Sequence, residues 1–263
     1  MTLIIGMKCS NGIVMGADGA ATYVTSVTQQ TIRQPVKKLS IIDNKVIIGI
    51  SGPLGMSEQF KAVLEKLWIE KAFSNKQTHE VMRILKENFY KQLEPEIKSA
   101  RDFKDLIGHP ALQNVLTQTL IGICVSKSHR LFIFDHQCSP EEAAGGICFY
   151  SVGIGQAIAD PFLAFLRKIF WPDNLPAISD GIFAVLWTLK HAIETIPGNV
   201  ADPKQIVVLE NPKDWKAREL TNEELYEHYQ AINDAENSLK DFKKEVGGKG
   251  QETDIEIPQL PKK

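Results

Sequence analysis

Two apolar runs joined by a short turn open the chain, and they constrain its fold more than any other feature. Leu3-Ile4-Ile5 and Ile13-Val14-Met15 flank the turn Ser10-Asn11-Gly12. Strand-forming residues on both sides of an Asn-Gly turn are typical of a β-hairpin, because Asn and Gly tolerate the backbone angles of a tight turn. The chain is therefore expected to begin inside a sheet, with Thr2 at the start of its first strand.

Thr2 is a candidate nucleophile, because an initiator methionine is usually removed when a small residue follows it. Loss of Met1 gives Thr2 a free α-amine beside its own hydroxyl. An α-amine titrates close to neutral pH, so it can accept the hydroxyl proton directly or through one water and activate the oxygen as a nucleophile. Asp18 ends the second strand and is expected to fold back beside residue 2. The alternative interpretation is a plain edge hairpin in which Thr2 has no chemical role.

Composition narrows the class of protein. The chain has 263 residues, of which 43% are hydrophobic, enough for one large domain with a sizeable core. Its 30 basic and 32 acidic residues leave a formal charge of −2, with no basic stripe interleaved with aromatics, so we expect no nucleic-acid partner.

We find no leader segment and no long apolar run, and expect a cytoplasmic protein with no membrane contact. The four cysteines show no CxxC pairing and are expected to be buried thiols, with no metal site and no cofactor.

Strand-like and helix-like segments alternate in blocks along the chain. Apolar runs predict a second hairpin over 37–42 and 45–50, a third over 119–125 and 131–134, and a last strand over 205–209. Helical spacing predicts two helices from residue 57, with Pro95 ending or kinking the second, and two more between 157 and 196. This order predicts an α+β fold, a four-layer αββα sandwich of two facing sheets with helices outside.

The composition predicts that the chain is divided into three segments. The main domain is expected over residues 1–220 and a charged helix over 221–246, whose thin apolar stripe suits a neighbouring subunit or solvent. A flexible tail is expected over 247–263.

Two further stretches extend the chemistry of Thr2 and Asp18. Lys38 begins the strand that follows the first hairpin, where its charge lowers the pKa of the Thr2 hydroxyl while Asp18 holds the ammonium in place. Lys37 is an equally basic neighbour, so the sequence leaves the choice between the two lysines open. The backbone amides of Ser51-Gly52, at the end of the next strand, are placed to hold the oxyanion of an acyl intermediate.

The order of these residues resembles the pattern of proteasome β-type subunits, of the bacterial proteasome homologue kind, within the N-terminal nucleophile hydrolases. The spacings from Thr2 to Asp18 and Thr22 and from Lys38 to Gly52 match that pattern, while the segment between Asp18 and Lys38 is longer. Residues 151–156 are similar to the family's glycine-serine-glycine turn before its third helix, and the resemblance covers about residues 2–209. It implies the N-terminal nucleophile hydrolase fold. It also implies roles for the matching residues: nucleophile Thr2, charged pair Asp18 and Lys38, oxyanion donor Gly52, and substrate-binding residues Thr22 and Ser51.

The resemblance implies a threonine-type endopeptidase that cleaves polypeptide substrates inside a homo-oligomeric ring, with an ATP-dependent unfoldase as partner. Two positions depart from the family pattern. Ile154 stands where the family has a serine that orders the N-terminal amine, and Glu194 matches the second amine-orienting acid only loosely. Two other functions therefore remain open, an inactive structural ring subunit of the same fold and an amidase that acts on a small amide.

Overall fold

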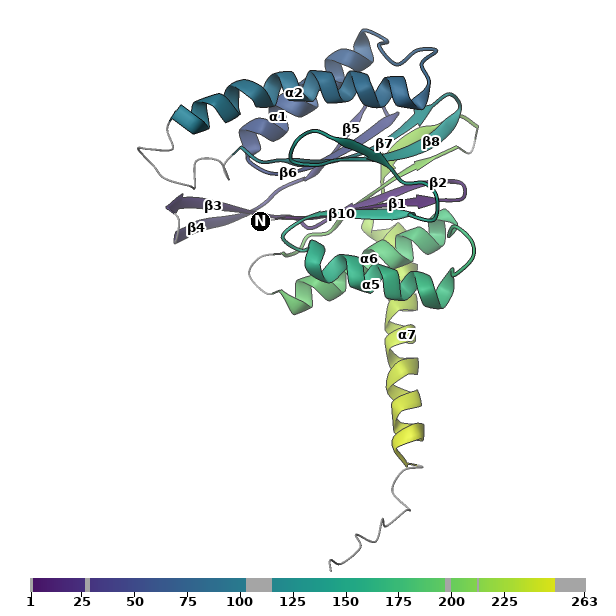
Figure 1. The fold of residues 1–263 in the computed structure, drawn as a ribbon. Helices are drawn as coiled ribbons and strands as arrows, with labels where there is room; N and C mark the ends of the chain where they lie inside the picture. Colours follow the sequence, from purple (N-terminus) through teal and green to yellow (C-terminus); the bar gives the residue numbers. More distant parts are fainter. Residues whose placement is uncertain (1, 27–28, 103–114, 197–199, 212, 249–263) are drawn as a thin grey trace, which may run out of the picture.

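Two five-stranded antiparallel sheets face each other in the computed structural model, which describes residues 2–26, 29–102, 115–196, 200–211 and 213–248 (Figure 1). The first sheet has the order β10-β1-β2-β11-β12 and contains β1 (Leu3–Cys9), β2 (Gly12–Ala17), β10 (Phe149–Gly153), β11 (Gln205–Glu210) and β12 (Lys216–Glu219). The second has the order β5-β6-β7-β8-β9 and contains β5 (Leu39–Ile42), β6 (Val46–Ser51), β7 (Gln118–Val125), β8 (Ser128–Phe134) and β9 (Pro140–Glu142).

Helices cover the outer face of each sheet. The second sheet carries α1 (Leu54–Ile69) and α2 (Thr78–Asp102), and the first carries α5 (Gln156–Phe170) and α6 (Ile178–Thr195). The predicted α+β class and four-layer αββα sandwich are confirmed.

Three hydrophobic cores fill the three interfaces between the four layers. One lies between α5/α6 and the first sheet, one between the two sheets, and one between the second sheet and α1/α2. Successive strand residues point to opposite faces, so Leu3 and Ile5 pack under the helices while Ile4 packs between the sheets. This explains why the strands read as unbroken apolar runs, since both of their faces are buried.

The three predicted hairpins are confirmed. Cys9 pairs with Gly12 across the first turn, Ile42 with Val46 across the second, and Val125 with Ser128 across the third. In each hairpin, the two apolar runs that are consecutive in the sequence are therefore also adjacent in the sheet.

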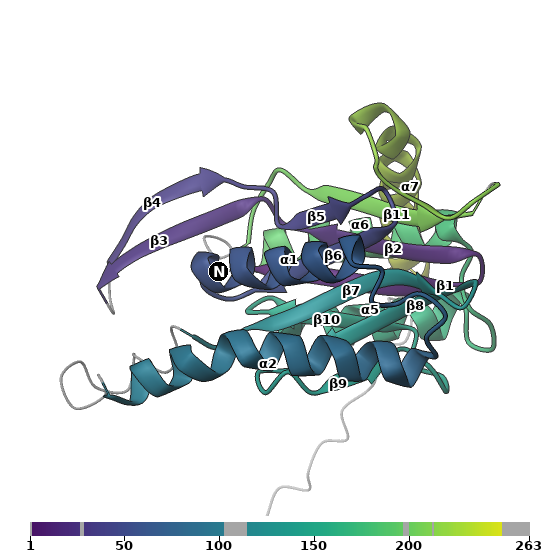
Figure 2. The same cartoon turned by 90° about the horizontal axis from the view of Figure 1, so that it is seen from above.

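A separate two-stranded hairpin leaves the sandwich beside the start of β1. It consists of β3 (Ala20–Ser26) and β4 (Gln29–Pro35), which pair with each other and with no other strand of the described chain. Figure 2 shows it running past the end of the sandwich like an arm. Asp18 therefore lies at the base of this arm, between β2 and β3.

Helix α2 continues through Pro95 to Asp102, where the sequence predicted an end or a kink at the proline. The proline ring leaves the carbonyl of Lys91 without its usual helical donor. Lys91 is exposed, and Leu93 and Ala100 keep both halves of the helix packed on the core.

Helix α7 (Asn222–Gly248) packs on α6 with its first half and then extends away from the body (Figure 1). Leu225 and Ile232 are buried against α6, and Glu236 accepts hydrogen bonds from Trp187 Nε1 at 3.0 Å and Lys190 Nζ at 2.6 Å. Farther along, three apolar side chains are exposed: Leu239 at 58%, Phe242 at 65% and Val246 at 54%. The tail was predicted over 247–263, but residues 247 and 248 still belong to α7, and 249–263 lie outside the described residues.

Within the described residues, none of the helices combines the length and apolar character of a transmembrane span.

We expect Phe89→Ala to lower the free energy of unfolding by about 3–5 kcal/mol, because it opens a cavity in the core under α1 and α2. Phe89 is fully buried, stacked on Phe60 with ring centroids 4.5 Å apart and edge-on to Phe134 at 5.3 Å. Urea denaturation measures the loss. Tyr90, the next residue of α2, is 44% exposed and gives the matched control Tyr90→Ala, which should cost less than about 1 kcal/mol. Equal losses in both variants would contradict this packing.

Candidate active site

Asp18 directly follows β2, and its carboxylate is fully buried. It accepts hydrogen bonds from four segments of the chain. Its Oδ1 accepts the backbone N–H of Leu3 at 2.8 Å, and its Oδ2 accepts those of Ala20 at 3.2 Å and Ala201 at 3.3 Å. The ammonium of Lys38 donates to Oδ1 at 2.6 Å. One buried charge thus ties together the chain start, the arm, the segment before β11 and the segment before β5.

Lys38 is held in place through its backbone as well as its side chain, which is only 7% exposed. The side-chain oxygen of Gln205, on β11, accepts the N–H groups of Lys38 at 3.2 Å and Leu39 at 3.0 Å. The Gln205 amide group in turn donates to the Leu39 carbonyl at 3.1 Å. Lys37 points away from this site to pair with Glu219 at the surface, where its side chain is 73% exposed. Of the two lysines left open by the sequence, only Lys38 contacts Asp18.

Ser51 and Gly52 end β6 on the same side of the sandwich. Gly52 has φ of +155°, and a Cβ there would lie 2.7 Å from Thr117 Cγ2 and 2.9 Å from the Leu116 carbonyl oxygen. Only glycine fits this bend, after which Pro53 leads into α1. Gly52 is exposed, and the hydroxyl of the preceding Ser51 lies close to Gly153.

Thr2 is half-buried and reaches the turn between β10 and α5. Its carbonyl oxygen accepts the N–H of Gly155 at 3.4 Å. A Cβ at Gly153, where φ is +97°, would lie 2.2 Å from that oxygen and 3.0 Å from Ser51 Oγ. Thr2, the turn and Ser51 therefore meet at one place.

Both ends of this turn are held by a carboxylate, that of Asp160, which no pattern in the sequence indicated. Asp160, on α5, accepts the hydroxyl of Ser151 at 2.5 Å with one oxygen and the amide of Gln156 at 3.1 Å with the other. Ser151 precedes the turn and Gln156 follows it. An aspartate one turn into a helix is a common surface residue, so only the three-dimensional contacts reveal this arrangement.

Two sequence-predicted positions do not join the cluster around Asp18. Thr22 lies on β3, where it pairs with Arg33, and the structure describes only its backbone. Glu194 is exposed near the end of α6, and the hydrogen bonds and ion pairs of the described residues do not include it. Ile154, at the turn, is 51% exposed.

Burial raises the pKa of all four cysteine thiols. The shift is largest for Cys9, while the pKa of Cys138 rises to about 11. These cysteines are protonated at neutral pH and are poor nucleophiles. Among the described residues, no group of His, Cys, Asp or Glu side chains is arranged to hold a metal ion.

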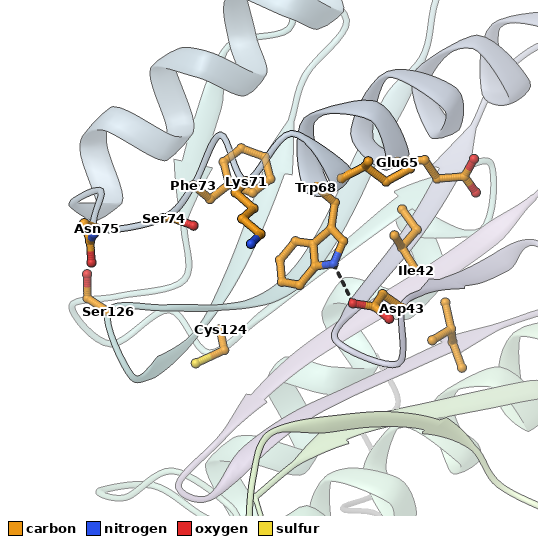
Figure 3. Close-up of a pocket in the computed structure, with 12 residues that line it drawn as sticks. Ile42, Asp43, Glu65, Trp68, Lys71, Phe73, Ser74, Asn75, Cys124 and Ser126 are labelled. Atoms are coloured by element: carbon orange, nitrogen blue, oxygen red, sulfur yellow. Dashed lines mark hydrogen bonds between the residues drawn. The ribbon is translucent and has the colours of Figure 1, made fainter.

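An open pocket of about 990 Å³ lies at the other end of α1 (Figure 3). Trp68 and Lys71 line it, and the Trp68 indole donates to Asp43 at 2.9 Å. Helix α1 begins two residues after Gly52 and has 16 residues, so it spans about 24 Å. The pocket is therefore separate from the site around Thr2.

Comparison with known proteins agrees with this fold. Residues 2–97 match the family model of proteasome subunits. No curated protein matches the chain in sequence. The predicted resemblance to proteasome β-type subunits is thus confirmed, with the family match lying in the part that contains Thr2, Asp18, Lys38 and Gly52.

Solved structures of Anbu proteins share the fold over nearly the whole chain. Anbu (ancestral beta-subunit) from Yersinia bercovieri has a TM-score of 0.65 at 13% identity and covers 98% of this chain and 99% of its own. A Gly-1 mutant of Anbu from Hyphomicrobium sp. strain MC1 has a TM-score of 0.64 at 14% identity, covering 97% and 100%. The Anbu complex from Pseudomonas aeruginosa, solved as a helical assembly, has a TM-score of 0.65 at 13% identity and covers 98% of both chains. The chain therefore has a proteasome-like β-subunit fold.

We expect Lys38→Met to lower the free energy of unfolding by about 3–5 kcal/mol, because it leaves the buried charge of Asp18 without its ammonium partner. Lys37→Met is the matched control, since the Lys37–Glu219 pair is solvent-exposed and its loss should leave stability nearly unchanged. Denaturation of both variants at neutral pH measures the difference. A larger loss in Lys37→Met would contradict the assignment of Lys38 as the partner of Asp18.

Proposed function

We propose that this protein is a threonine-type endopeptidase of the N-terminal nucleophile class, with Thr2 as nucleophile after removal of Met1. The single observation that carries the proposal is the buried Asp18–Lys38 ion pair at 2.6 Å, whose carboxylate also binds the N–H of Leu3, the residue next to Thr2. A buried ion pair is weak evidence for stability, so its contact with the backbone next to Thr2 favours a chemical role.

The chemistry follows from the groups around residue 2. The α-amine of Thr2 accepts the hydroxyl proton while Oγ attacks the carbonyl carbon of the scissile peptide bond. The positive charge of Lys38 stabilises the developing negative charge, and the backbone N–H of Gly52 donates to the oxyanion. Collapse releases the amine product with the transferred proton and leaves an acyl ester on Thr2, which water then hydrolyses.

Self-association fits the same proposal. The exposed stripe Leu239, Phe242 and Val246 lies on the half of α7 that extends from the body, where a monomer leaves it in water. An Anbu complex has been solved as a helical assembly. We propose that this chain also assembles with copies of itself into a ring or helical oligomer that acts on polypeptides, with an ATP-dependent unfoldase as a partner. Its free thiols fit the reducing cytoplasm.

A second candidate function is an inactive structural subunit of the same fold. Glu194 favours it, because this exposed side chain makes none of the described contacts expected of an amine-orienting acid. Ile154 also lacks the hydroxyl expected at its position.

Intact-protein mass and reaction with an N-terminal-threonine-directed covalent inhibitor test the proposal. We expect the purified protein to lack Met1 and to gain one inhibitor adduct. Thr2→Ala should lose Met1 equally well, because alanine is also small, but should form no adduct. Thr2→Ser keeps a hydroxyl and should retain the adduct.

Retained Met1 in the wild-type protein, or an adduct that persists in Thr2→Ala, would exclude Thr2 as the nucleophile. The structural subunit would then be the better interpretation.

We expect Phe242→Asp to shift the oligomer toward smaller species, because it places a charge in the centre of the exposed stripe of α7. Analytical ultracentrifugation at equal protein concentration measures the shift. Asn237→Asp adds the same charge to α7 outside the stripe and should leave the distribution unchanged. An identical distribution for Phe242→Asp and wild type would contradict an interface at this stripe.

A further inference from the structure

The turn between β10 and α5 contacts the Thr2 backbone directly. Gly155 donates to the Thr2 carbonyl oxygen, and Gly153 approaches that oxygen so closely that any larger side chain would displace it. Leu3 pairs with Gly153 in the sheet, so a shift of the turn moves the start of β1. The position of Thr2 therefore depends on how firmly the turn is held.

Asp160 holds this turn from both ends at once. Its Oδ1 accepts from Ser151 Oγ at 2.5 Å, within the range of about 2.5–2.7 Å that is typical of a hydroxyl bound to a carboxylate. Its Oδ2 accepts from Gln156 Nε2 at 3.1 Å. The buried Ser151 hydroxyl is 1% exposed and depends on this carboxylate for its hydrogen bond within the described residues.

We propose that Asp160 is a positioning residue for Thr2: by joining Ser151 to Gln156 it fixes the Gly153–Gly155 turn against the Thr2 carbonyl and so sets the place of the Thr2 backbone. The consequence for catalysis rests on the proposed function. The hold of Asp160 on the Gly153–Gly155 turn, called the clamp below, does not rest on it. A nucleophile held by its neighbours tolerates little displacement, since a misplacement on the order of 1 Å can cost about 100-fold in rate.

This role distinguishes Asp160 from the amine-orienting acids expected from the sequence. Asp160 acts through Ser151, Gln156 and the turn, without contacting the reacting atoms. It provides a support that Ile154 and the exposed Glu194 do not supply.

Hydrogen–deuterium exchange of the full chain tests the clamp without requiring activity. We expect Asp160→Ala and Ser151→Ala to speed exchange at the amides of Leu3 and Gly155 by about tenfold or more, because these amides report the hold on residue 2. Asp180→Asn is the matched control. Asp180 also lies on a helix of this layer and accepts the N–H of Ala177 at 3.4 Å, but α6 begins beside the β1–β2 turn at the other end of β1.

The rate of inhibitor addition at Thr2 tests the consequence, measured well below the melting temperature so that every variant is folded. We expect Asp160→Ala and Ser151→Ala each to slow addition by about tenfold or more, and the double variant to be no slower than the slower single variant, because both act through one bond. Asp160→Asn keeps an acceptor for Ser151 and should recover part of the rate. A residue that contributes only to global stability would leave the rate of the folded protein unchanged.

The outcomes separate the two proposals. Wild-type exchange at Leu3 and Gly155 in both single variants overturns the clamp. A wild-type rate of addition in Asp160→Ala overturns its role in placing the nucleophile. If the wild-type protein forms no adduct, the proposed function fails, and the exchange rates alone decide whether Asp160 holds Thr2.

Discussion

The buried charge of Asp18 is the interaction on which the site depends. A carboxylate with no exposure to water is costly unless hydrogen bonds and a counter-charge surround it. Here three backbone N–H groups and the Lys38 ammonium meet that need, and they come from four separate segments of the chain. Because Lys38 is in turn held by Gln205 on β11, any loosening of one segment exposes or unpairs the charge. The requirement to satisfy one carboxylate thus fixes the geometry around residue 2.

The sandwich gives this charge cluster its setting. Alternation along β1 sends Leu3 and Ile5 toward α5 and α6, and sends Ile4 into the interface between the sheets. Residue 2 directly precedes β1 and contacts the β10–α5 turn. The β10–α5 turn contacts the Thr2 backbone directly and Asp18 holds the neighbouring Leu3 N–H, which explains how a chain start that normally frays is held in a defined place.

Local sequence patterns predicted the hairpins and the paired helices, because apolar runs and tight turns act over a few residues. They did not predict β9 and β12, which are short and polar and gain their order only from neighbours in the sheet. The contacts between the residues of the site could not be predicted for a related reason. Gln205 and Lys38 are 167 positions apart, and neither residue type signals the other. The resemblance suggested the pairing of Asp18 and Lys38 although the segment between them is longer than is usual in the family, whereas the choice against Lys37 needed the direction of each side chain.

The most direct measurement is a crystal structure of the protein after reaction with the N-terminal-threonine-directed inhibitor. We expect Thr2 to be the first residue, with density continuous from its Oγ to the inhibitor, Lys38 next to Asp18, and the inhibitor oxygen directed at the N–H of Gly52. Density for Met1 still joined to Thr2, with the inhibitor bound elsewhere or absent, would exclude Thr2 as the nucleophile.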